Sequence, residues 1–204
     1  MNEVKNKPKG DIKVIMHKGG KYDIKTGTII GGEVLKTEED HNLIVNNASL
    51  LIAGRMAPPN LNSDNGIRYD YGLQCLAIGY DSENHGEDVT NSKLFGEIYR
   101  KKFDDWGYVH VVEDNKELKK DMVSNQIQYV TTFEANIPPS PDDTNDSVAI
   151  NEMGLFGGDC VIENGKPAIV DNETKTGIMF NYKTFSTWSK PSEAQMTIIW
   201  TITY

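Results

Sequence analysis

The segment that most constrains the fold is QIQYVTTFEANI, residues 126–137, in which most of the apolar side chains stand two residues apart. Because residues two apart point to the same face of a β-strand, this period of two predicts a long strand with one buried face. Pro138 and Pro139 follow at once, and proline cannot donate to a β-ladder, so we expect the strand to end there. The buried face would carry Ile127, Tyr129, Thr131, Phe133, Ala135 and Ile137.

Other segments share this β character. Residues 196–204, MTIIWTITY, alternate large apolar side chains with threonine, and β-branched and aromatic residues favour strands. The short apolar run at 73–80 and the segment 108–114 are predicted as further strands. The chain shows no βαβ alternation and no internal repeat, so we predict a mainly β fold, an antiparallel β-sandwich.

One short helix and an N-terminal hairpin complete the predicted fold. Asn46 or Asn47 can cap a helix over the apolar residues that follow, and Pro58 and Pro59 would stop it. Residues 11–32 predict a β-hairpin that turns at Gly19–Gly20. We therefore divide the chain into a polar tail with a β-hairpin arm, residues 1–40, and a β-sandwich domain, residues 41–204. The candidate assembly residues of the arm are Ile12, Val14, Met16, Tyr22 and Ile24.

Composition and charge exclude several classes of function. The chain has 30 acidic residues against 21 basic ones and a net charge of −9, which argues against a nucleic-acid partner. No stretch approaches the ~18 apolar residues that span a membrane, and the first residues lack the apolar region of a signal peptide. The two cysteines, Cys75 and Cys160, form no C-x-x-C pair, so a thiolate zinc site is excluded and both are interpreted as small buried residues of a reducing cytosol.

The glycine-rich stretch NEMGLFGGD, residues 151–159, has the look of a phosphate-binding loop but lacks its chemistry. A P-loop needs Lys and Ser or Thr after its last glycine, whereas Asp159 and Cys160 follow here. A dinucleotide loop needs a different glycine spacing and a helix after it. We therefore predict a turn between two strands, because glycine permits positive φ. Its residues are Glu152, Gly154, Leu155, Phe156 and Gly157.

No motif predicts catalysis, a metal or a cofactor. The four histidines lie too far apart for a local ligand pair, although a trio that forms only in the folded chain stays open. DSENHGED, from Asp81, imitates the start of a calcium loop, but Ser92 stands where a bidentate Glu is required. No G-x-S-x-G elbow is present, and neither cysteine has an adjacent base. We therefore expect a protein that is not an enzyme and needs no cofactor.

Five blocks, taken in order, resemble a known family. They are HNLIVNNASLLIAGRM, LAIGYDS with NSKLFGEIYR, TTFEANI, INEMGLFGGD, and the final MFNYKTFSTWSKPSEAQMTIIWTITY. Together they run from about His41 to Tyr204. In this order the blocks are similar to the N-terminal domain of phage tail-collar fibre proteins, within the tail, baseplate and tail-fibre-adaptor structural proteins of tailed bacteriophages.

The resemblance implies a virion structural subunit that is assembled in the host bacterial cytoplasm. It would join components of the tail, baseplate or neck and collar, and its partners would be other phage tail or neck proteins and copies of itself in a ring. The arm could add a strand to the sheet of a neighbour. We also expect the segment from Glu97 to Arg100 to make a polar contact under the sheet.

A carbohydrate-binding β-sandwich module is the alternative from another functional class. Trp106, Tyr108 and Trp188 would then form an exposed aromatic platform for a receptor or cell-wall glycan, whereas burial of the two tryptophans would argue against it. A hydrolase would need a pocket into which carboxylates or histidines converge.

Overall fold

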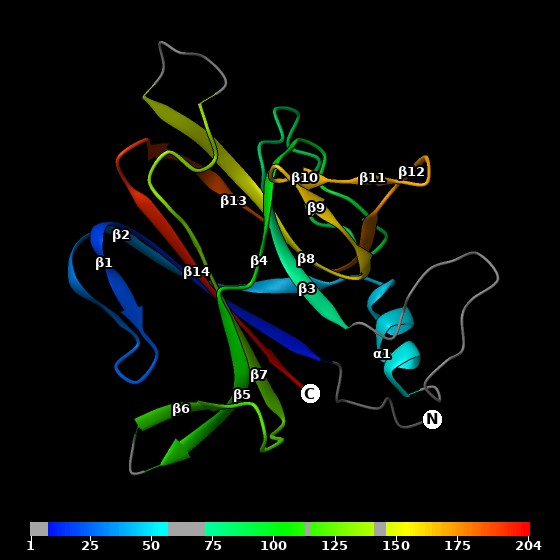
Figure 1. Ribbon diagram of the computed structural model, residues 1–204, viewed down its shortest axis with the longest axis horizontal. Coiled ribbons are helices and arrows are strands. Elements are labelled where there is room, and N and C mark those ends of the chain that lie inside the picture. The colour runs from blue at the N-terminus through cyan, green and yellow to red at the C-terminus, as the bar shows by residue number, and fades with distance from the viewer. Residues whose placement is uncertain (1–7, 57–71, 113–114, 141–145) are drawn as a thin grey trace. The chain divides into compact units, whose positions relative to one another are not determined.

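The computed structural model describes residues 8–56, 72–112, 115–140 and 146–204. The chain is mainly β, with 65% of its residues in strands and 4% in helix, and its strand ladders are antiparallel. These findings confirm the predicted mainly β class with one short helix, while the stacking of two sheets as a sandwich stays a prediction. The chain forms two compact units, which we call unit 1 and unit 2 (Figure 1). Unit 1 comprises Met1–Asn42, Phe103–Val148 and Lys190–Tyr204, and unit 2 comprises Leu43–Lys102 and Ala149–Ser189.

Unit 1 holds six neighbouring strands of a ten-stranded sheet, in the order β2-β1-β14-β7-β5-β6. The bounds are β1 Lys9–Asp23, β2 Thr28–Ile44, β5 Asp105–Val112, β6 Asn115–Lys119, β7 Gln126–Phe133 and β14 Gln195–Thr203. The alternating segments found in the sequence, β7 and β14, pair along their length, with Trp200 opposite Tyr129. Trp200 and Phe133 are fully buried on the predicted core face, but Gln128 and Val130 of the opposite face are buried as well, so β7 is covered on both faces and the expectation of a single buried face is wrong. β7 ends four residues earlier than expected, because Asn136 takes a positive φ of 62° and turns the chain.

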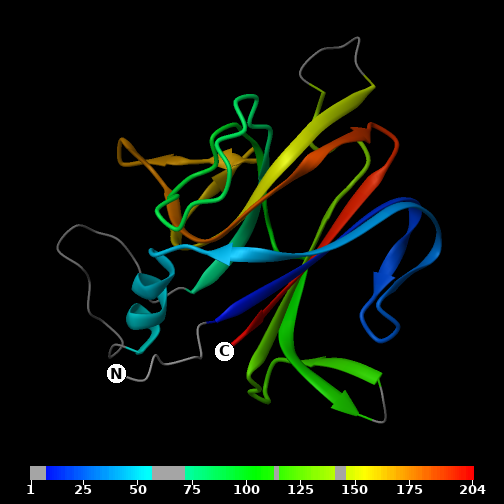
Figure 2. The ribbon, with the colours of Figure 1, turned by 180° about the vertical axis from the view of Figure 1, so that it is seen from behind.

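The N-terminal hairpin is part of this sheet. β1 lies between β2 and β14 and pairs with β14 from Lys9–Thr203 to His17–Gln195. Residues 1–40 therefore share a unit with two later segments of the chain. This division into units differs from the expected one, an arm at residues 1–40 and a domain at residues 41–204. Both views show β1, in blue, alongside the red β14 (Figures 1 and 2).

The hairpin turns later than the sequence predicts. Its turn lies at residues 24–27, where the Asp23 carboxylate accepts the N–H groups of Lys25 and Thr26. Gly19, at the predicted turn, instead pairs with Gly32 inside the ladder. Three glycines at this level have positive φ, and they bend the hairpin so that its tip doubles back, as Figure 2 shows. They are Gly19, Gly20 and Gly31.

Unit 2 contains the strand order β4-β3-β8-β13, with the end of β2 next to β13. The bounds are β3 Leu73–Gly79, β4 Glu97–Lys102, β8 Ser147–Cys160 and β13 Thr176–Pro191, so the ends of β8 and β13 reach into unit 1. Four two-residue strands form two small hairpins between β8 and β13: β9 Ile162–Glu163, β10 Lys166–Pro167, β11 Ile169–Val170 and β12 Glu173–Thr174.

The predicted helix is present as α1, Ala48–Met56. Its buried side chains, Ala48 and Leu51, face the sheet, and Leu51 approaches β8 at Gly157. Pro58 and Pro59, which we expect to stop it, lie outside the described residues. No helix among the described segments has the length and apolar content to cross a membrane.

The glycine-rich stretch is strand rather than turn, which corrects the sequence prediction. β8 runs unbroken through Glu152, Gly154, Leu155, Phe156 and Gly157, and it pairs with β3 from Gly79–Glu152 to Leu73–Gly157. Neither Gly154 nor Gly157 has a positive φ; of these glycines only Gly158 does, at 71°. A Cβ on Gly157 would overlap the carbonyl of Gly72, so the absence of a side chain serves close packing. Leu155 and Phe156 are buried, as expected of anchors.

Candidate functional site

The candidate functional site is a long loop of unit 2, residues 80–96, which connects β3 to β4. Three large apolar side chains of this loop stay exposed to solvent, Tyr80 at 41%, Val89 at 43% and Phe95 at 40%. Loops usually carry binding functions when a rigid scaffold positions them. Whether this loop can do so depends on how firmly its ends are held.

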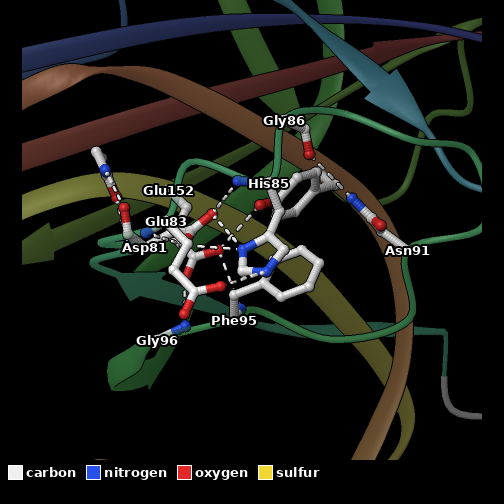
Figure 3. Close-up of polar contacts among 10 residues, drawn as sticks. Asp81, Glu83, His85, Gly86, Asn91, Phe95, Gly96 and Glu152 are labelled. Atoms are coloured by element: carbon white, nitrogen blue, oxygen red, sulfur yellow. Dashed lines mark hydrogen bonds and ion pairs between the residues drawn. The ribbon is translucent and has the colours of Figure 1, made fainter.

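Asp81 holds the first half of the loop (Figure 3). Its buried carboxylate accepts N–H groups from Glu83 at 3.0 Å and from His85 at 2.6 Å, and the His85 ring lies 2.9 Å away. The side chain of Asn151 of β8 binds the Asp81 main chain twice: its oxygen accepts the Asp81 N–H, and its NH₂ group donates to the Asp81 carbonyl. Burial opposes ionisation, but the N–H donors and the His85 ring outweigh it and lower the pKa of Asp81. Asp81 is thus a carboxylate that organises a turn.

Glu152 of β8 holds the second half. This residue is fully buried, and its carboxylate accepts the N–H groups of Phe95 at 3.1 Å and Gly96 at 2.7 Å. The Tyr182 hydroxyl of β13 donates a third hydrogen bond at 3.0 Å. Burial and the neighbouring Glu152 charge raise the pKa of Tyr182, so it remains a donor. Gly79 leaves room for this carboxylate, because a Cβ there would overlap Glu152 Oε1.

Further contacts fix the loop between these anchors. The rings of His85 and Phe95 stack with centroids 4.0 Å apart and planes inclined by 3° (Figure 3). Glu87 forms an ion pair with Lys183 of β13 at 3.0 Å and accepts the N–H of Thr184 at 3.1 Å. The loop is therefore ordered before any partner arrives, which lowers the entropic cost of binding.

The imitation of a calcium loop at Asp81 has a structural explanation. Both carboxylate oxygens of Asp81 accept N–H groups, and the second ring nitrogen of His85 lies 3.2 Å from Glu83. The other histidines lie apart from this loop. His17 contacts Gly19 and Thr197, His41 pairs with Asp11, and His110 contacts the carbonyl of Met122. Within the described part of the chain, no three His, Cys, Asp or Glu residues converge as a metal site would require.

The candidate assembly residues of the hairpin are largely core. Ile12, Val14 and Met16 are buried in unit 1, so in the folded unit these side chains do not form a contact surface. Tyr22 and Ile24, in the hairpin tip, pack against a small buried cluster of the sheet. The tip thus covers the face of its own sheet, which corrects the expectation of an arm that presents these five residues to a neighbour.

The three rings expected to form an exposed aromatic platform, those of Trp106, Tyr108 and Trp188, are not all exposed. Trp188 is 2% exposed and packs against Phe185 with ring centroids 6.4 Å apart, so it cannot stack on a ligand. Trp106 is 37% exposed and meets Tyr108 edge-on, with centroids 6.3 Å apart. Of the two tryptophans in the platform, only Trp106 therefore remains accessible.

The doubled-back hairpin tip creates a groove of about 690 Å³ in unit 1, which sequence reasoning missed. Tyr22 and Lys25 of the tip lie on one side, and polar side chains of the sheet line the floor. One ion pair lies along it, Lys13 with Glu39 at 3.0 Å, and the His41 ring is hydrogen-bonded to the Asp11 carboxylate at 2.6 Å. The floor includes Gln126, Gln128, Ile199 and Thr201, with Gln128 donating to Thr201 at 3.0 Å.

Comparison of the sequence with known proteins found no match. No protein-family model matches the chain, and no curated protein matches it.

Proposed function

We propose that the chain is a structural subunit of a bacteriophage virion, which joins tail, baseplate or neck components in a symmetric oligomer. The five ordered sequence blocks support the virion, and the mainly β architecture is compatible with it. The observation that carries the assembly role is the 80–96 loop. Its two buried carboxylates bind main-chain N–H groups, so they hold a surface in place and are not arranged around a reactive centre.

The loop suits contact with a second copy of the chain. Tyr80, Val89 and Phe95 present apolar area on a backbone that is already ordered, and burying such area drives association. Homo-oligomers usually close with point-group symmetry, so one loop per subunit can serve every interface of a ring.

Light scattering after size-exclusion chromatography tests this assembly role. We expect the wild-type chain to elute as a closed oligomer and Val89→Asp to elute as a folded monomer. Ile169→Asp, which changes a more exposed apolar residue of the β11–β12 hairpin, is the matched control and should stay oligomeric. A monomeric wild type, or a Val89→Asp protein of unchanged mass, contradicts the proposal.

The virion location has a separate test. Mass spectrometry of tailed particles, purified from the lysate of a bacterium that carries the coding sequence, should detect the chain in a fixed ratio to the other tail proteins. Its absence from intact particles contradicts the virion assignment while leaving the oligomer result standing.

A glycan-binding module is the second candidate. Its binding site would be the groove of unit 1 and not the expected aromatic platform. Amide and hydroxyl groups on its floor can pair with sugar hydroxyls, and Tyr22 offers a ring. Its lining carries three lysines and three carboxylates, a balance that suits a neutral ligand: Lys13, Lys25, Lys116, Asp11, Glu39 and Asp40. Titration calorimetry with neutral oligosaccharides of hexose and of N-acetylglucosamine should show binding that Gln128→Leu weakens at least ~10-fold. If Trp106→Ala weakens it instead, the site lies at the exposed tryptophan. If the wild type binds none of these sugars, this candidate falls.

A further inference from the structure

The core of unit 2 brings together the two cysteines, which lie 85 positions apart in the sequence. Cys75 of β3 is fully buried, Cys160 at the end of β8 is 5% exposed, and their sulfur atoms are 2.9 Å apart. Both are free thiols within one apolar cluster that also contains Phe156 and Met179. A disulfide bond of ~2.05 Å would require the sulfurs to approach by about 0.9 Å.

A buried arginine makes this pair asymmetric. Arg100 of β4 is 1% exposed, and its Nη1 lies 3.4 Å from the Cys160 sulfur while also donating to the carbonyl of Thr176 at 2.7 Å. The rest of the guanidinium binds Glu97 through two hydrogen bonds of 2.7 and 2.6 Å, which is the polar contact expected from the sequence. The positive charge is thus fixed beside one sulfur and held there by a carboxylate.

The two thiols consequently differ in acidity. The hydrogen bond from the Cys75 thiol, together with the Arg100 charge, outweighs burial and lowers the pKa of Cys160 to about 7. The same hydrogen bond and burial raise the pKa of Cys75. Cys160, which lies beside the Arg100 charge, is therefore the more acidic of the two thiols.

We propose that Cys75 and Cys160 form a redox pair that a hydroperoxide converts to an internal disulfide. The Cys160 thiolate attacks one oxygen of hydrogen peroxide, the O–O bond breaks, and the hydroxide that leaves takes a proton to become water. Cys75 then attacks the resulting sulfenic acid sulfur, the S–O bond breaks, and the hydroxyl group leaves with the Cys75 proton as a second water. Two thiols lose two electrons, and one hydrogen peroxide gains them.

The disulfide would fasten β3 to the far end of β8. These strands pair from Gly79–Glu152 to Leu73–Gly157, and Cys160 lies just beyond that ladder. The inference concerns the interior of unit 2 and does not depend on the proposed assembly role. Arg100 contacts the sulfur of Cys160, so its positive charge stabilises the thiolate that reacts.

Peptide mapping of the folded full-length chain after exposure to hydrogen peroxide tests the proposal. We expect a cross-linked peptide that contains Cys75 and Cys160, a loss of about 2 Da, and reversal by dithiothreitol. Met122, which is 51% exposed, serves as an internal control for the oxidant dose. If Met122 becomes sulfoxide while both cysteines can still be alkylated after denaturation, the proposal is wrong.

Two variants separate the roles of the sulfurs. In Cys75→Ser, Cys160 should form a sulfenic acid that dimedone traps and should form no cross-link. In Cys160→Ser, Cys75 should stay reduced at the same dose. Equal trapping of Cys75 in Cys160→Ser would overturn the assigned order, and the wild-type map decides the pairing even where a variant fails to fold.

Discussion

Replacing Glu152 by Gln is the sharpest test of how the 80–96 loop is held. The change keeps the shape of the side chain but removes its charge and turns one acceptor oxygen into an NH₂ group. In the folded chain the carboxylate accepts three hydrogen bonds, from the N–H groups of Phe95 and Gly96 and from the Tyr182 hydroxyl. Gln can accept at only one of its two terminal atoms, so at least one buried donor loses its partner.

The expected loss of stability follows from these contacts. A hydrogen bond to a charged group contributes ~1.5–3 kcal/mol, and a buried donor without a partner costs ~1–3 kcal/mol. Losing one such bond and orphaning one donor therefore lowers the free energy of unfolding by about 3 kcal/mol. Urea unfolding measures this loss, and amide hydrogen exchange at Phe95 and Gly96 locates it.

The matched control is Glu163→Gln, which makes the same chemical change at an exposed position of the β9 strand. It should change the free energy of unfolding by less than ~0.5 kcal/mol. If Glu152→Gln is as stable as this control, and the Phe95 and Gly96 amides exchange no faster than in the wild type, Glu152 does not hold the loop.

Two further changes test other parts of the structure. Burial lowers the pKa of Lys190 to about 8, against ~10.4 in the unfolded chain, so the unfolded chain binds more protons between these values and the free energy of unfolding should rise as pH rises from about 8 to 10. In urea unfolding, Lys190→Met should abolish that rise and stabilise the fold at pH 7 by ~1–2 kcal/mol. The control Lys18→Met, at an exposed position, should do neither. Gly157→Ala should destabilise the fold by ~2–3 kcal/mol, because the added Cβ overlaps the Gly72 carbonyl. Gly86 has open space around it and a φ of 77°, so Gly86→Ala should cost only ~1 kcal/mol. Equal unfolding midpoints for the two variants would refute the packing argument.

Periodicity predicts the strands of this protein well, because side chains two residues apart share one face of a strand. β7, β14 and α1 lie within one to four residues of their expected bounds. Glycines mislead the same reasoning, since a strand uses glycine for close approach as readily as a turn uses it for positive φ. Gly157 and Gly19 both lie inside ladders, while the real hairpin turn depends on Asp23 and a single glycine at position 27.

The sites were less predictable, because they depend on registers between distant strands. Glu152 is predicted from the sequence to lie in a turn, but it lies in a strand, where its buried carboxylate accepts three hydrogen bonds. Local sequence does not reveal that Cys75 and Cys160 meet, because their proximity follows from the pairing of β3 with β8. The groove of unit 1 likewise exists only because glycines within the hairpin ladder bend its tip.

The central place of β1 has a consequence for synthesis in the cell. Lys9 pairs with Thr203, so β1 can pair with the adjacent β2 early but waits for β14, which is made nearly two hundred residues later. At ~5–20 residues per second, that wait lasts on the order of ten seconds or more, during which unit 1 cannot complete its sheet on the ribosome. Such long-range pairing also slows folding. The edge of β1 that pairs with β14 therefore stays open until residue 203 has left the ribosome.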